Sequence, residues 1–121
     1  MSYTFYIRDV KTDRELYWGN YTSNVYHILN EAFKTIKVAF PYYISQSWNH
    51  WSDGLMYSDR PPTYLATLLF ELDRHKERYK EFEPSNGWGS FDGIFNFLNG
   101  ILGRLQEYEE KNILYEVSVE W

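Results

Sequence analysis

The chain has 121 residues, and its 12 Lys and Arg against 17 Asp and Glu give a formal net charge of -5. This length suits a single domain over residues 1–121. The lack of cysteine excludes a disulfide scaffold, a cysteine-ligated metal site and a cysteine nucleophile. The acidic balance argues against direct nucleic-acid binding, which needs a basic stripe. Neither a signal-peptide layout nor a membrane-length apolar run is present, so we expect a cytoplasmic protein with no membrane partner.

Aromatic side chains are unusually abundant, with 8 Phe, 5 Trp and 12 Tyr. One core of this size cannot bury so many rings, and each Tyr or Trp keeps a polar group that needs a partner. Two interpretations stay open. The surplus rings either lie flat on the surface around a Tyr-rich core, or they line a binding cleft or an oligomer interface. The oligomer that we expect is a symmetric homodimer.

Strand patterns lie at both ends of the chain. Residues 3–9 are β-branched and aromatic and alternate between two faces, which predicts a strand. Residues 14–18 can return as its hairpin partner after a polar turn. Residues 113–119 also alternate between apolar and polar side chains, which predicts a C-terminal strand.

Apolar residues at helical spacing predict three helices between these strands, over 23–40, 63–82 and 90–110. The segment 41–63 is rich in Tyr and Trp and predicts a long ordered loop with at most one short helix. Three glycines weaken the last helix, and we expect them to allow close packing against a neighbouring element. They are Gly93, Gly100 and Gly103. The element order predicts an α+β fold: a small antiparallel sheet from an N-terminal hairpin and the C-terminal strand, packed by about three helices.

No catalytic constellation is evident in the sequence. His27 and His75 lie in predicted helices without a metal-binding spacing. His50 is the exception that could act on a ligand, because it lies between Trp48 and Trp51 in the aromatic segment. Nucleophile-elbow, phosphate-loop and dinucleotide patterns are absent. We therefore expect a protein that is not an enzyme and that needs no metal or cofactor.

Two short polar segments run directly into predicted helices: residues 19–24 and residues 86–90. Helix N-termini present free N–H groups and a partial positive charge, which suit phosphates. Asn amides can both donate and accept toward a base or a ribose. The alternative is that the segments only cap helices, through Thr22, Ser23, Asn24 or Ser90.

The ligand site that we expect combines these two segments with the aromatic segment. Trp88 would stack on a planar ring, and Arg60 would meet a phosphate, with Arg8 or Arg104 as substitutes. The predicted site residues are Asn20, Thr22, Asn24, Tyr43, Trp51, Arg60, Asn86 and Trp88.

The same segments resemble a family of small phage and prophage proteins. Asn20-Tyr21-Thr22-Ser23-Asn24 matches an Asn-x-Thr-x-Asn motif, and Asn86-Gly87-Trp88-Gly89 matches an Asn-Gly-Trp-Gly motif. The central Pro61-Pro62 and a final strand with Val117-Ser118 extend the resemblance over most of the chain. The resemblance implies a phage or prophage origin and a place of action in the host cytoplasm. Small accessory phage proteins often counter host defence, and one class, the signal sponges, sequesters nucleotide immune messengers without cleaving them.

Three functions remain open from the sequence. The first is an anti-defence protein that binds and sequesters a nucleotide-derived signal, such as a cyclic nucleotide or an ADP-ribose derivative. The second is a protein–protein inhibitor of a host defence enzyme, which would act by an acidic surface that blocks an interface or mimics DNA. The third is a hydrolase of such a nucleotide, using His50 or His75. A concave aromatic pocket favours the first, and a flat acidic patch favours the second.

Overall fold

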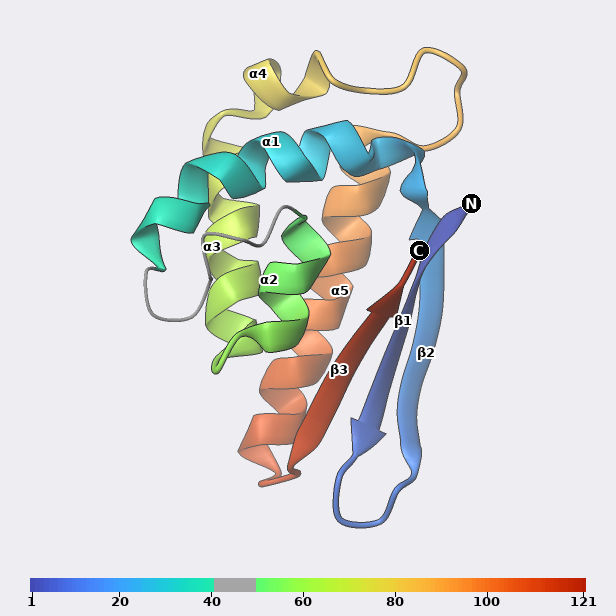
Figure 1. Cartoon of the computed structure of the whole chain (residues 1–121), viewed down its shortest axis with the longest axis vertical. Coiled ribbons are helices and arrows are strands. Elements are labelled where there is room, and N and C mark those ends of the chain that lie inside the picture. Colours follow the sequence, from blue (N-terminus) through green and yellow to red (C-terminus); the bar gives the residue numbers. More distant parts are fainter. Residues whose placement is uncertain (41–49) are drawn as a thin grey trace.

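The computed structural model describes residues 1–40 and 50–121, which adopt an α+β fold (Figure 1). Three strands form an antiparallel sheet in the order β2-β1-β3. They are β1 (Ser2–Asp9), β2 (Glu15–Thr22) and β3 (Tyr115–Glu120). The helices lie on one side of this sheet (Figure 1). The predicted fold class, with an N-terminal hairpin and a C-terminal strand in one sheet, is confirmed.

The helices are more divided than the sequence predicts. Short 3-10 turns at Ser23–Val25 and Lys37–Ala39 flank the first α-helix. The predicted helix 63–82 is two helices, because His75 has φ -120 and ψ 39, which is outside the helical region. The α-helices are α1 (Tyr26–Ile36), α2 (Trp51–Tyr57), α3 (Pro61–Arg74), α4 (Lys76–Lys80) and α5 (Phe91–Glu110). The short helix expected within 41–63 is α2, and residues 41–49 lie outside the described residues.

The core forms where the apolar face of the sheet meets the helices. Tyr3, Phe5 and Ile7 alternate along β1 toward this face, and each is buried. The Trp51 ring lies against them, with ring centroids 4.9 Å from Tyr3 and 5.9 Å from Phe5. Since Trp51 begins α2, its burial holds that short helix against the sheet.

The second strand is longer than predicted and continues past Trp18 to Thr22, which pairs with Ser2 of β1. Residues 19–22 are therefore strand rather than loop. The physical reason is the side chain of Tyr21, which packs on Phe97 of α5 with ring centroids 5.8 Å apart. Gly19 fits this strand because a Cβ there would collide with the hydroxyl of Tyr17.

In α5, the predicted Ser90 cap is confirmed, whereas the predicted close packing holds for one of the three glycines. Ser90 caps the helix as predicted, because its Oγ accepts a 2.9 Å hydrogen bond from the Gly93 N–H. Gly93 also allows close packing, since a Cβ there would collide with Tyr21. The same expectation is wrong for Gly100 and Gly103, where a Cβ would have no neighbour within 4 Å. Both are exposed, so their lack of a side chain serves no packing within the described residues.

The sheet has two distinct ends. Met1, Thr22 and Trp121 lie together at one end, beside the starts of α1 and α5, and we name it the terminal end (Figure 1). The opposite end contains the turn at residues 10–14 and the end of α5 at Glu110 (Figure 1). We name it the hairpin end. The 20 residues of α5 make it about 30 Å long, and it runs from the first end to the second.

Candidate functional site

The two polar segments singled out in the sequence meet at the terminal end. The Ser90 N–H donates a 3.1 Å hydrogen bond to the Tyr21 hydroxyl. Gly89 has a φ of +92, and a Cβ there would lie 2.6 Å from Cγ2 of Thr22. This close approach and the left-handed backbone together explain why glycine occupies the position. The two segments are therefore in direct contact, although the hydrogen bond between them joins residues 69 positions apart in the chain.

The polar and aromatic side chains of these segments do not converge on one pocket. Asn20 is exposed on β2, paired with Thr4 of β1. The side chain of Asn86 makes a hydrogen bond within its own loop, because its Oδ1 accepts the Trp88 N–H at 2.9 Å. The Trp88 side chain is 68% exposed. Thr22 caps the turn that follows β2, since its Oγ1 accepts the Asn24 N–H at 3.3 Å.

The other predicted site residues are placed elsewhere. Arg60 is exposed at the hairpin end, between Asp59 and Pro61, which line a hollow together with Glu109 of the last turn of α5. The length of α5 therefore separates Arg60 from Trp88. Trp51 is fully buried, so its ring faces core residues rather than a surface. Tyr43 lies outside the described residues.

A concave site does exist at the terminal end, and we name it the terminal hollow. It has a volume of about 340 Å³ and lies between the start of α1, the residue before α2 and the end of β3. Its lining residues are Met1, Ser23, Asn24, Tyr26, Asn30, His50 and Trp121. Of the predicted site residues within the described part of the chain, only Asn24 lines this hollow.

Aromatic rings form part of its wall. The rings of His50 and Trp121 meet edge to face, with centroids 4.8 Å apart at 68°. Trp121 also contacts Tyr3, at 5.9 Å between centroids, which joins it to the buried rings of the core. Tyr26 is 42% exposed and Trp121 is 50% exposed, so both present ring surface that the core does not cover. Such rings can stack on a planar ligand.

Two side-chain amides complete the polar lining. Asn30 lies on α1, and its Oδ1 accepts a 3.0 Å hydrogen bond from the backbone N–H of Trp51. This bond ties the start of α2 to α1 and so positions His50, the residue before Trp51. It also orients the amide, which leaves the NH2 group of Asn30 as the donor that it can offer to the hollow. The Asn24 side chain lines the hollow with both a donor and an acceptor.

Two buried polar atoms without partners lie at and next to the hollow. Nδ1 of His50 and Oγ of Ser52 are buried and make no hydrogen bond within the described residues. Ser52 is the buried polar residue of the described core, with 0% exposure. Folded proteins satisfy nearly all such groups, and an unsatisfied one is destabilising by about 1–3 kcal/mol.

The charge around the hollow differs from that of the whole chain. Among the described residues, no Asp or Glu side chain lines it, although the chain carries a net charge of -5. The backbone N–H groups that lead into α1 are already occupied. The Ser23 N–H donates to the Met1 carbonyl, and the Asn24 N–H donates to the Thr22 hydroxyl. The Tyr26 N–H donates to the Ser23 carbonyl. The rings and the two amides of the lining can thus accept a ligand with a planar ring and hydrogen-bonding groups.

Most of this lining carries little signal in the sequence. Tyr26 and Asn30 are four residues apart, which places them on the same face of α1. The amide of Asn30, in the middle of an amphipathic helix, is the one signal that the sequence offers here. It does not indicate which residues lie around it. Trp121 gives no signal, because only the folding of β3 against β1 brings it to residue 50. His50, close to Trp48 and Trp51 in the sequence, is the histidine that the sequence favours for contact with a ligand.

Comparisons of this chain with protein-family models, with curated proteins and with solved structures find no match. Within residues 1–40 and 50–121, no three His, Asp or Glu side chains are grouped so that they could hold a metal ion. In the same part of the chain, every helix is too short or too polar to cross a lipid bilayer.

Proposed function

We propose that this protein binds a small nucleotide-like molecule in the terminal hollow. The observation that carries the proposal is the lining itself: the uncovered rings of Tyr26 and Trp121, together with the His50 ring and the two amides of Asn24 and Asn30. The volume of about 340 Å³ lies within the range of small-molecule sites. A planar base would stack on the rings, and the amides would read its edge.

The energies of such contacts suffice for useful affinity. Stacking one base on an aromatic side chain contributes about 1–3 kcal/mol. A hydrogen bond to a charged group contributes about 1.5–3 kcal/mol, which applies to a phosphate that accepts from the side-chain amide of Asn24 or Asn30. A few such contacts reach the roughly -8 kcal/mol of micromolar binding after the loss of translational and rotational freedom.

We further propose that the bound molecule is held rather than cleaved. Within the described residues, the lining of the terminal hollow includes one histidine and no carboxylate side chain, so a general acid and base pair is not assembled in it. In the cell, the ligand would be a nucleotide-derived immune signal, and the protein would act as a phage-encoded sponge in the host cytoplasm. The motif resemblance supports this biological part of the proposal.

The test is calorimetric titration of the purified chain with AMP, ADP-ribose and cyclic dinucleotides. We compare Trp121→Ala with Trp18→Ala, because both tryptophans are 50% exposed and only Trp121 lines the hollow. Trp121→Ala should weaken binding by about 1–3 kcal/mol, whereas Trp18→Ala should leave it unchanged. Recovery of the intact nucleotide after prolonged incubation is expected.

Three results would count against the proposal. Equal losses in the two tryptophan variants would place the ligand elsewhere or reveal a general loss of folding, which a thermal melt of each variant separates. Absence of binding across the nucleotide panel would remove the ligand class. Conversion of the nucleotide by the wild-type chain would replace sequestration with hydrolysis.

A further inference from the structure

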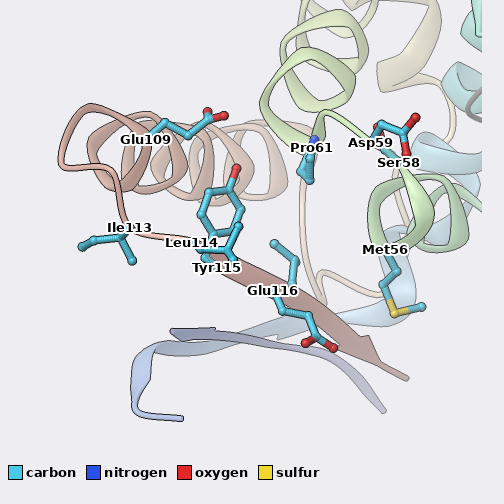
Figure 2. Close-up of a pocket in the computed structure, with 10 residues that line it drawn as sticks. Met56, Ser58, Asp59, Pro61, Glu109, Ile113, Leu114, Tyr115 and Glu116 are labelled. Carbon is cyan, nitrogen blue, oxygen red and sulfur yellow. The ribbon is translucent and has the colours of Figure 1, made fainter. Parts of the chain in front are cut away.

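A second hollow lies at the hairpin end, away from the terminal hollow, and we name it the hairpin hollow (Figure 2). Its volume is about 300 Å³. It is formed by the end of α2, the start of α3, the last turn of α5 and the first half of β3. The lining residues are Met56, Ser58, Asp59, Pro61, Glu109, Ile113, Leu114, Tyr115, Glu116 and Val117.

The backbone of β3 presents an open edge to this hollow. In the sheet of the described residues, β3 is an edge strand and pairs with β1 on one side only. The Val119 N–H donates a 3.2 Å hydrogen bond to Sδ of Met56, so it points away from β1. The Leu114 C=O accepts the Val10 N–H at 2.9 Å, so it points toward β1. Backbone direction alternates along a strand, and the N–H and C=O groups of Tyr115 and Val117 therefore point outward, as those of Val119 do.

This edge is covered at one point and open at the next. The outward N–H of Val119 is covered, because it donates its hydrogen bond to Sδ of Met56 in α2. Across residues 1–40 and 50–121, no backbone group of another element hydrogen-bonds to the outward groups of Tyr115 or Val117. An unpaired edge beside a hollow is a template for another strand, and most proteins protect such edges. Here the protection ends where the hairpin hollow begins.

Apolar side chains form the floor of the hairpin hollow beside this edge, and acidic side chains form its rim. Met56, Pro61 and Val117 supply apolar surface. Leu114 adds more, because it is 61% exposed. Figure 2 shows the carboxylates of Glu109 and Asp59 on opposite sides of Pro61.

The electrostatics of the rim favour a cationic partner. No Lys, Arg or His side chain of the described residues lines the hairpin hollow. Glu116 is already paired, since its Oε2 lies 2.8 Å from the Arg8 guanidinium. Burial raises the pKa of the Tyr115 phenol most, and the negative charge of Glu109 raises it further. Glu109 and Tyr115 both line the hollow. Arg60 is exposed between Asp59 and Pro61 but does not line the hollow, and Glu109 and Asp59 give the lining an excess of negative charge that attracts a cation.

We propose that the Tyr115–Val117 edge of β3 receives an extended segment of a partner protein in which basic and apolar residues alternate. Strand addition to a sheet edge obtains affinity from backbone hydrogen bonds and specificity from alternate side chains. The outward groups of Tyr115 and Val117 would form those hydrogen bonds. The basic side chains would face the helices, where their methylene groups lie on the apolar floor and their charges meet Glu109 and Asp59. The apolar set would point to the opposite face of the sheet, beside the exposed Leu114. A second copy of β3 fits poorly, because its own Glu116 and Glu120 would face this acidic rim. The inference concerns a different surface from the nucleotide proposal and goes beyond it.

The probe is a capped heptapeptide, Lys-Val-Lys-Val-Lys-Val-Lys, titrated into the full chain labelled for NMR. We expect shift changes centred on Tyr115 and Val117, and their amide exchange should slow by about tenfold or more at saturation. Two further peptides carry N-methyl groups on all Val or on all Lys nitrogens. Only one set of nitrogens faces the protein in an added strand, so one of these two peptides should lose binding and the other should keep it.

Matched charge reversals test the rim. The double variant Asp59→Lys with Glu109→Lys should weaken binding of the heptapeptide by about tenfold or more, because opposite charges become like charges. The control pair Glu77→Lys with Glu110→Lys gives the same change in net charge at exposed positions outside the hollow, and should change affinity by less than about threefold. The proposal is overturned if the heptapeptide does not bind, if both N-methylated peptides bind as tightly as the parent, or if the two charge-reversal pairs weaken binding equally.

Discussion

The hydroxyl of Tyr64 donates a 2.5 Å hydrogen bond to the backbone carbonyl of Trp51. Tyr64 lies in the first turn of α3 and Trp51 begins α2, so this bond joins two helices through groups that are fully buried. The Tyr64 ring also lies against Gly54, where a Cβ would come within 2.7 Å of the ring. Together with the Asn30 contact to Trp51, the bond fixes the helix that places His50 at the terminal hollow.

Tyr64→Phe should therefore destabilise the fold by about 1–3 kcal/mol, because it leaves the buried carbonyl of Trp51 without its donor. The measurement is urea unfolding of the variant and the wild type. Tyr6→Phe is the control, since Tyr6 is half-buried on the outer side of the sheet, away from the helices. Equal changes in the two variants would show that the Tyr64 hydroxyl has no special role.

The glycines of α5 give a prediction with opposite signs. Gly100→Ala and Gly103→Ala should each stabilise the chain by about 0.5–1 kcal/mol, because a Cβ meets open space there and Ala favours the helix. Gly93→Ala should destabilise it, because the new methyl group collides with Tyr21. Thermal and urea unfolding of the three variants check both signs. A destabilising effect at Gly100 or Gly103 would contradict the exposure described for them.

Alkaline pH should unfold this protein. Among the described residues, four tyrosines have a pKa raised above the ordinary value of 10.0, with burial as the largest cause in each. They are Tyr3, Tyr64, Tyr79 and Tyr115. Below about pH 10, both the folded and the unfolded chain keep these protons, so the stability that they support is fully present. Above that pH the unfolded chain loses protons that the folded chain retains, which favours unfolding.

Stability measured by urea unfolding should therefore fall continuously as the pH rises from about 10 toward the raised values. Phenolate absorbance followed in the same samples should rise together with the loss of structure, because unfolding exposes the buried phenols. Constant stability across this alkaline range would contradict the prediction. Tyr115→Phe should make the fall less steep.

Variants of Trp88 and Trp121 distinguish binding at the motif segment 86–90 from binding in the terminal hollow. Trp88 is 68% exposed and does not line the terminal hollow. Trp88→Ala should change the free energy of unfolding by less than about 0.5 kcal/mol and leave nucleotide affinity unaffected. Calorimetric titration beside Trp121→Ala makes the comparison. A selective loss of affinity in Trp88→Ala would instead place the ligand on the loop of residues 86–90.

Local patterns of the sequence predicted the elements that depend on near neighbours. Alternation along residues 3–9 and 113–119 predicted both terminal strands, and Ser90 predicted the start of α5. The boundaries of β2 were wrong because Gly19 and Asn20 disfavour strands locally, while pairing with β1 and the packing of Tyr21 on Phe97 outweigh that preference. Propensity reports local preference, and the partner strand supplies the remaining free energy.

By itself, the sequence determined the α+β class, the terminal strands, the capped start of α5 and the surplus of rings, because periodicity and capping act over a few residues. Only the tertiary structure decided which rings face a ligand. Trp51, which sequence reasoning placed in the site, is buried at the core, and Trp121, which no motif marked, lies against His50. Arg60 and Trp88 are separated by the length of α5, a distance that no local pattern encodes. Such placements follow from how the helices pack on the sheet, since packing brings together residues that are far apart along the chain.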